Sequence, residues 1–211
     1  MTRTSTGRKN GRAKFGDGGE DTGLLLTSIA RKAFAENGYH GVSIRDIAKM
    51  ANLSLAALYY YHPSKQHLLY ALLKQSTVDF TNGFHAALRA ADNQPVAKLD
   101  ALIRSTIEYR VHHRVESDLI ATEMRNLDPE SLDELLKPWD EARDVLEEII
   151  VDGVEAGVFT IPDPNDARHS VLAICNSIAG WYDPNTSVSL DELVTRYQFL
   201  CHELLGYSPK S

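Results

Sequence analysis

The sequence predicts an all-α fold of about nine helices, in which a small N-terminal three-helix domain precedes a larger helical domain. Apolar residues recur at helical spacing from Leu24 to the end of the chain, and no segment alternates as a strand does. Serine, proline, asparagine and glycine interrupt this pattern where helices can begin and end. Residues 1–20 hold too few apolar groups to form a core, so we expect a disordered basic arm there. The two helical domains are expected at residues 21–66 and 67–211.

The charges are divided unevenly along the chain. The 211 residues carry a net charge of −7, yet residues 1–75 hold 11 Lys and Arg against 5 Asp and Glu, a net charge of +6. Residues 76–211 hold 11 against 24, a net charge of −13. A basic module joined to an acidic body is typical of a protein that binds an anionic partner through one part of its chain.

Three features concern location and chemistry. No apolar run is long enough to span a bilayer, and MTRTSTGRKN lacks the apolar segment of a secretory signal, so we expect a cytoplasmic protein without a membrane partner. Cys175 and Cys201 lie in apolar helical patterns, which predicts buried reduced thiols. The adjacent His112 and His113 face different directions on a helix, so we expect no metal, and no motif indicates a cofactor.

Two short helices with serine caps predict a helix-turn-helix. Ser43 is placed to cap the helix IRDIAKM, and Ser54 to cap a third helix that ends at Tyr60 or Tyr61. Asn52 lies between them and tolerates the left-handed backbone that a sharp turn requires. In this motif the second helix enters the major groove of DNA.

The remaining helices follow from their start and stop signals. The first helix runs from Leu24 to a stop at Asn37-Gly38, and Ser64 begins a helix of about 26 residues, or ~39 Å, that leaves the small domain as a rod. Such a rod can transmit a shift at its far end to the helix-turn-helix. Further helices are predicted near residues 96–113, 115–126, 130–156, 164–181 and 189–205.

The N-terminal pattern resembles a known family. The run LLLTSIARKAFAENGYHGVSIRDIAKMANLSLAALYYYHPSKQHLLYALL is similar, nearly end to end, to the DNA-binding domain of TetR-type transcriptional regulators. Two positions differ, since the family often has glycine at the position of Ala56 and usually an aromatic residue at that of His62. A buried imidazole at His62 requires a polar partner.

The resemblance implies that residues around the turn contact a double-stranded DNA operator: Ser43, Arg45, Ser54, Leu55, Ala56, Ala57, Tyr59, Tyr60 and Lys65. Ser43 and Lys65 are expected at phosphates, and Arg45 at a base edge. The apolar tip of the recognition helix suits thymine methyl groups. Tyr59 and Tyr60 are expected to face DNA, whereas Tyr61 shares the buried face with Leu58.

For the larger domain, the resemblance implies a homodimer through the last two long helices and a small-molecule inducer held among the others. The candidate ligand-binding residues are Tyr109, Arg110, His113, Met124, Trp139, Arg143 and Asn176. For the aromatic residues and Met124, ordinary core is the alternative. The stretch GVEAGVFTIPDPNDARHSVLAICNSIAGWYDP resembles members that respond to acyl-CoA thioesters, which makes an acyl-CoA one candidate inducer, with Arg110 or Arg143 at its phosphates.

Two other classes of protein compete with this interpretation. An enzyme is disfavoured, because the chain lacks a nucleophile elbow, a phosphate-binding glycine loop and a metal motif. A helical protein-interaction module, or an activator without an inducer, remains the alternative. The sequence predicts a ligand-responsive repressor that binds a palindromic operator as a dimer.

Overall fold

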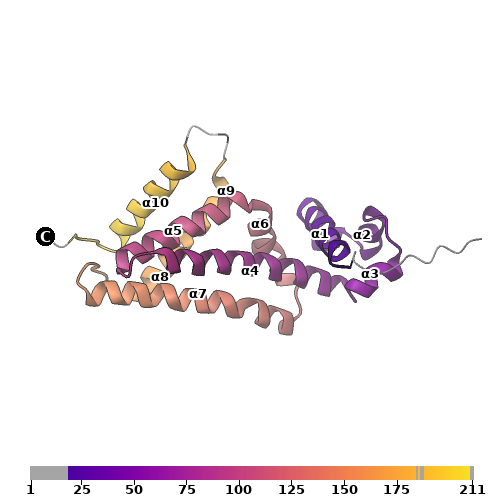
Figure 1. Cartoon of the computed structure of the whole chain (residues 1–211), viewed down its shortest axis with the longest axis horizontal. Helices are drawn as coiled ribbons and strands as arrows, with labels where there is room; N and C mark the ends of the chain where they lie inside the picture. The colour runs from indigo at the N-terminus through magenta and orange to yellow at the C-terminus, as the bar shows by residue number, and fades with distance from the viewer. Residues whose placement is uncertain (1–18, 184, 186–187, 210–211) are drawn as a thin grey trace, which may run out of the picture.

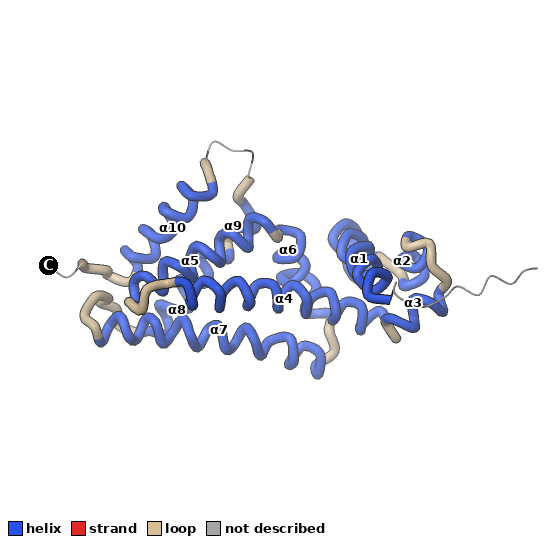
Figure 2. The backbone as a smooth tube through the Cα atoms, in the orientation of Figure 1, coloured by secondary structure: helices blue, strands red, loops and turns tan. Residues whose placement is uncertain are grey.

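The computed structural model of the chain describes residues 19–183, 185 and 188–209, and every regular element among them is helical (Figure 2). The molecule is elongated, with α1, α2 and α3 at one end and the long helix α4 running from them into the larger domain (Figure 1). The all-α prediction is confirmed. Most of the predicted arm lies outside the described residues, and its last two residues, Gly19 and Glu20, begin α1.

The N-terminal domain is formed by α1 (Gly19–Gly41), α2 (Ile44–Met50) and α3 (Leu55–Tyr61). The stop predicted at Asn37-Gly38 is a kink inside α1: Gly38 has a φ of 70°, which glycine adopts without strain, and the helix continues from there to Gly41. The predicted turn between α2 and α3 is also present: Asn52 has a φ of 54°, in the left-handed region that asparagine tolerates.

Serine caps begin both short helices as predicted. The Ser43 hydroxyl accepts the amide of Asp46 at 3.2 Å, and the Asp46 carboxylate accepts the amide of Ser43 at 3.1 Å, which is a reciprocal capping box. The Ser54 hydroxyl accepts the amide of Ala57 at 3.1 Å. Each serine hydroxyl accepts an amide of the first turn that has no partner within its own helix. These two hydrogen bonds determine where α2 and α3 start.

The larger domain continues from α4 and packs its helices side by side. Its elements are α4 (Lys65–Ala90), α5 (Pro95–His112), α6 (Arg114–Glu123), a 3₁₀ turn (Met124–Asn126), α7 (Pro129–Glu155), α8 (Pro164–Asn176), α9 (Ile178–Trp181) and α10 (Leu190–Leu204). Within the described ranges no helix is both long and apolar enough to cross a bilayer. The two cysteines are buried, as predicted.

One predicted helix, 164–181, is divided into α8 and α9 at Ser177. The Ser177 hydroxyl donates to the carbonyl of Ile174 at 2.7 Å, and the Ser177 carbonyl accepts the amide of Gly180 at 3.1 Å, three residues on. A serine that bonds to the helix backbone competes with the regular ladder. The division places a helix end beside the pocket described below.

Two apolar cores meet along α4. The first contains the buried side chains of α1, α2 and α3, the leucines of the first turns of α4, and also Leu119 of α6 and Leu135 of α7. The second holds the buried side chains of α5, α8 and α10 with Phe80 and Phe84 of α4. Because α6 and α7 contribute to the first core, a displacement of either helix reaches the helix-turn-helix through packed side chains.

Candidate nucleic-acid interface and ligand pocket

The three consecutive tyrosines of α3 have different surroundings. Leu58 is fully buried, and Tyr61 is half-buried close to Gly23 of α1. Tyr59 is exposed, and Tyr60 is 78% exposed with its ring edge-on to Tyr61 at 5.2 Å. The predicted division into one packing residue and two outward residues is confirmed, while the contact of the outward pair with DNA stays a prediction.

Polar and basic groups line a shallow open groove between α2 and α3. Arg45, Lys49, Asn52 and Ser54 lie along it, beside the apolar Leu55. Neither cation forms an ion pair with any residue that the structure describes. A groove with two such cations and a recognition helix beside it is suited to phosphate and base contacts.

Ser43 and Asp46 form a polar pair at the start of α2. The Ser43 hydroxyl donates to the Asp46 carboxylate at 2.5 Å, and the bonds from Ser43 lower the pKa of that carboxyl. The hydroxyl is exposed, and its present partners are both within the capping box. The structure thus gives Ser43 a capping role in addition to the predicted phosphate contact.

Lys65 holds the start of α4 against α1. Its Nζ lies 4.1 Å from the ring centroid of Tyr39 and 5.9 Å from that of Phe34, a cation–π arrangement. Burial lowers the pKa of Lys65, although the carboxylate of Glu123 acts in the opposite direction. The predicted phosphate contact of Lys65 remains a prediction beside this packing role.

The larger domain contains a pocket of about 450 Å³, a size common for small-molecule sites. It lies among α5 to α9 and has a mostly apolar wall. Its lining comprises Arg110, Ser117, Asp118, Ile120, Ala121, Met124, Leu136, Trp139, Arg143, Asn176, Ser177, Ala179 and Gly180.

Five of the seven predicted ligand-binding residues line this pocket: Arg110, Met124, Trp139, Arg143 and Asn176. Tyr109 and His113 do not. The Tyr109 hydroxyl donates to the carbonyl of Ser76 at 2.8 Å, its ring stacks on His113 at 4.5 Å, and burial raises its pKa. These two rings support the wall behind Arg110.

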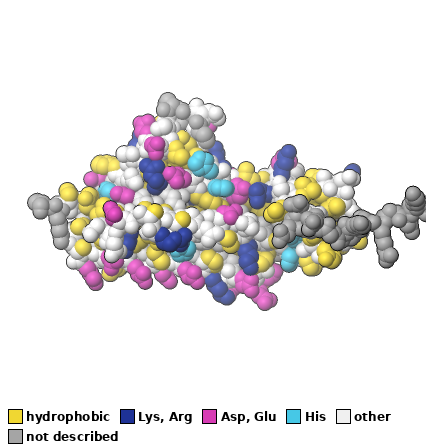
Figure 3. All heavy atoms as spheres, viewed as in Figure 1, with side chains coloured by type: hydrophobic (Ala, Val, Ile, Leu, Met, Phe, Trp, Pro, Cys, Tyr) yellow, Lys and Arg dark blue, Asp and Glu magenta, His cyan; other side chains and the backbone are white. Residues whose placement is uncertain are grey.

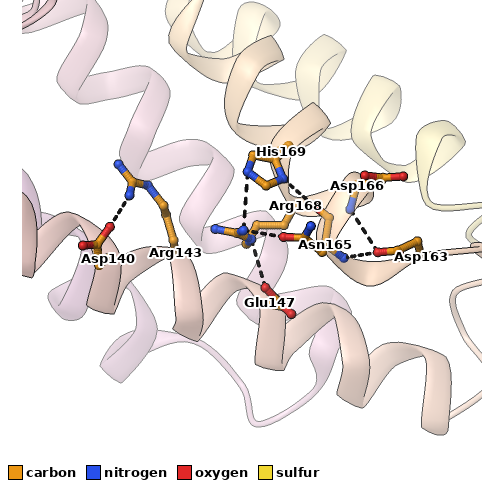
Figure 4. Close-up of polar contacts among 8 residues, drawn as sticks. All are labelled: Asp140, Arg143, Glu147, Asp163, Asn165, Asp166, Arg168 and His169. Carbon is orange, nitrogen blue, oxygen red and sulfur yellow. Dashed lines mark hydrogen bonds and ion pairs between the residues drawn. The ribbon is translucent and has the colours of Figure 1, made fainter.

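The two pocket arginines differ in their surroundings. Arg110 is 6% exposed, whereas Arg143 lies at the edge of the pocket and is ion-paired with Asp140 of the same helix (Figure 4). Nearby, Glu147 and Arg168 form an ion pair of 3.0 Å that joins α7 to α8 (Figure 4). Arg143 therefore has a carboxylate partner already.

Sequence reasoning missed the pocket residues of α6. Ser117, Ile120 and Ala121 of α6 and Met124 of the following 3₁₀ turn recur at intervals of three and four, so they share one face. Among them only Met124 was predicted. The spacing was visible in the sequence, but which face of α6 meets the cavity depends on how α6 packs against α1.

An adjacent face of α6 contacts the N-terminal domain. Glu116 forms an ion pair of 3.1 Å with Arg31 of α1, and the Glu123 carboxylate accepts the amide of Tyr39 at 3.2 Å. In the following turn, Asn126 lies 2.9 Å from the Nε2 of His40. One short helix thus contacts both the pocket and the end of α1.

Acidic and apolar side chains occupy different faces of the larger domain. Figure 3 shows acidic side chains along the lower edge of the molecule, where α7 lies. Exposed apolar side chains occur on α9 and α10, where Phe199 is 61% exposed, Leu200 is exposed, and the exposed Trp181 stacks on Tyr197 at 6.4 Å. Among the described residues, no group of three or more His, Cys, Asp or Glu is arranged to hold a metal ion.

Comparison with known proteins agrees with this architecture. A helix-turn-helix joined to a helical domain defines a class of DNA-binding transcriptional regulators. Residues 26–72 match the bacterial regulatory proteins of the tetR family, and residues 92–205 match the tetracyclin repressor-like C-terminal domain. The chain belongs to the TetR family and is a DNA-binding transcriptional regulator rather than an enzyme.

Individual relatives cover most of the chain. The HTH-type transcriptional repressor NicS of Pseudomonas putida is 30% identical over 181 residues, or 84% of this chain and 82% of NicS. The regulator RutR of Escherichia coli K12 is 29% identical over 160 residues, or 75% and 72%. The crystal structure of AibR in complex with isovaleryl coenzyme A and operator DNA has a TM-score of 0.78 at 21% identity, over 89% of this chain and 100% of AibR, which shows the fold alone.

Proposed function

We propose that this regulator is a repressor that binds a palindromic operator as a homodimer and leaves it when a small molecule fills the pocket. The observation that supports this most directly is the position of α6. Ile120 and Met124 face the pocket, while Glu116 and Glu123 hold α1. A ligand that moves α6 therefore changes the position of the helix-turn-helix.

The ligand is proposed to control operator binding by changing the distance and orientation between the two recognition helices of the dimer. In a dimer, two recognition helices bind half-sites about one DNA turn, ~34 Å, apart. A ligand shifts the equilibrium only if it favours one arrangement of the two helix-turn-helix domains over another. Through the contacts of Glu116 and Glu123 with α1, a ligand that moves α6 also moves the helix-turn-helix domain. The long helix α4, which the sequence predicts to transmit a shift, provides a second connection.

The dimer is supported by the exposed apolar side chains of α9 and α10. Trp181, Phe199 and Leu200 lie on the segments predicted to form the interface. Two small residues, Ala173 of α8 and Gly180 of α9, are also exposed, and small side chains allow close approach of a second helix. Acidic α7 would repel DNA, which leaves the end with α3 for the operator.

The DNA contact is tested with Tyr60. Tyr60→Ala removes a side chain that lies largely outside the core, so we expect operator affinity to fall roughly tenfold with little change in thermal midpoint. The operator is first obtained by capturing genomic DNA fragments with the intact protein, and binding is then measured by fluorescence anisotropy. Tyr60→Phe, which keeps the ring, serves as the matched control. Unchanged operator affinity in Tyr60→Ala would show that Tyr60 does not contact DNA and that the proposed orientation of α3 in the groove is wrong.

An acyl-CoA thioester is the first candidate inducer to test. The neighbour AibR was crystallised with isovaleryl coenzyme A and operator DNA, and the present pocket has a mostly apolar wall with arginines. The thermal midpoint is measured with a panel of CoA thioesters of increasing acyl length, with free CoA as control. Stabilisation by a thioester but not by CoA, together with release of the captured operator, is expected. No stabilisation by any thioester would remove this class.

A further inference from the structure

The guanidinium of Arg110 is a buried cation whose hydrogen-bond partners are neutral. Its Nε and Nη2 donate to the side-chain oxygen of Asn176 at 3.1 and 2.9 Å, and its Nη1 donates to the Ser117 hydroxyl at 3.1 Å. No carboxylate of the described residues lies within ion-pair distance of it. Its partners come from α8 and α6, so Arg110 joins three helices at the pocket wall.

Aromatic faces compensate part of the cost of burying this charge. The guanidinium carbon lies 5.2 Å from the ring centroid of Phe80 and 5.6 Å from that of Trp139. A buried charge without an opposite charge is nevertheless unfavourable, and burial lowers the pKa of Arg110 accordingly. The free protein therefore keeps a cation at its pocket that an anion would stabilise.

The remaining donors of Arg110 suit a carboxylate. A guanidinium has five N–H donors, and the three bonds to Asn176 and Ser117 leave two of them for a ligand. Two donors on one planar group match the two oxygens of a carboxylate. A phosphate dianion would require a second cation, but Arg143 is already paired with Asp140, and Asp118 adds negative charge at the rim.

The rest of the pocket is apolar. Ile120, Met124 and Leu136 line it together with the indole of Trp139, which stacks on Phe80 at 4.5 Å. Burial of apolar ligand surface against these side chains supplies affinity, while one charged contact supplies orientation.

We infer that the ligand of this pocket is a monocarboxylate with an apolar body, whose carboxylate is bound by Arg110. The inference rests on the proposed response to a small molecule and names its chemical class. A free carboxylic acid and an acyl thioester whose chain ends in a carboxylate both offer this group. The experiment therefore includes both.

Trp139 provides a direct reporter of binding. The chain has two tryptophans, so Trp181→Phe leaves Trp139 as the only one. Its fluorescence is titrated with benzoate, phenylacetate and octanoate, each beside its uncharged amide, and with phenyl phosphate. Succinyl-CoA and butyryl-CoA compare thioesters with and without a terminal carboxylate. We expect at least one carboxylate to bind about tenfold more tightly than its amide and than phenyl phosphate.

Matched variants identify the arginine responsible. Arg110→Gln should remove the preference for the acid over its amide, whereas Arg143→Gln should retain it. If Arg110→Gln does not fold, the comparison of each acid with its amide in the unmutated pocket still tests whether the pocket prefers a carboxylate. Equal binding of every acid and its amide, a preference for phenyl phosphate, or an undiminished preference in Arg110→Gln would overturn the inference.

Release of the operator by the same ligands is measured with the unmutated chain, which separates the two proposals. A carboxylate that binds through Arg110 without releasing the operator contradicts the proposed function and supports the inference. An amide or butyryl-CoA that releases the operator as well as the matching acid supports the proposed function and contradicts the inference.

Discussion

His62 is a titratable side chain in the core of the helix-turn-helix domain. Its Nδ1 lies 3.2 Å from the Nδ1 of His67, so one neutral ring donates and the other accepts. Its Nε2 is buried without a hydrogen-bond partner among the described residues. Burial lowers the pKa of His62, and the nearby His67 lowers it further. The polar partner that the sequence required is thus a second histidine.

Acid should destabilise the protein through His62. Because the folded state holds the pKa of His62 below its unfolded value, the unfolded chain binds the proton first as the pH falls below about 6.5. Stability from the neutral ring is complete above that pH and is lost as the pH falls towards the folded-state pKa. His62→Phe should therefore lose less thermal stability than the unmutated chain between about pH 7.5 and pH 5.5. Equal losses would contradict this assignment.

Gly153 in α7 is required by packing rather than by backbone conformation. A Cβ there would lie 2.0 and 2.3 Å from two ring atoms of the buried Phe159. Gly153→Ala is expected to lower the free energy of unfolding by roughly 1–3 kcal/mol. Gly83→Ala is the control, because its nearest side-chain atom, on Ser105, is 3.6 Å away and alanine favours a helix by about 0.5–1 kcal/mol. Urea unfolding of both variants measures the difference, and equal effects would contradict the packing argument.

At the scale of the elements, helix starts were more predictable than helix faces. Ser43, Ser54 and Ser64 cap their helices where the sequence placed them, because capping involves residues three positions apart. The break at Ser177 was not predicted, since a serine inside a helix bonds to the backbone in some surroundings and to solvent in others. The ligand face of α6 was also missed, because it is determined by α1, which is far away in the sequence.

The contact between α6 and α1 can be tested by exchanging its charges. Arg31→Glu and Glu116→Arg each replace the ion pair of 3.1 Å with two like charges, whereas the double variant restores an ion pair with its charges exchanged. We expect each single variant to lose about 0.5–1 kcal/mol of stability and the double variant to recover at least half, because the pair is partly exposed. Operator affinity should follow the same order. Additive effects in the double variant would show that this pair does not connect the two helices.

At the scale of the whole molecule, the uneven charge along the sequence corresponds to different regions of the folded chain. Arg45 and Lys49 lie on α2 at one end of the molecule (Figure 1), and acidic side chains follow the lower edge where α7 lies (Figure 3). The position of α2 and α3 could be predicted, because their caps and the turn between them are local. The pocket could be predicted only in part, because Arg110, Ser117 and Asn176 come from three helices that meet only in the folded chain.

The exposed apolar face of α10 supports a final prediction about assembly. Phe199→Asp places a charge on this face, and a charge buried in an interface without a partner is strongly unfavourable. We expect the variant to sediment as a monomer and to bind the full operator at least tenfold more weakly, since each monomer contacts one half-site. Its helical circular dichroism should be unchanged, because Phe199 is 61% exposed within one chain. Val78→Asp, on the exposed side of α4, is the control and should remain a dimer. A Phe199→Asp variant that stays dimeric would place the interface elsewhere on the molecule.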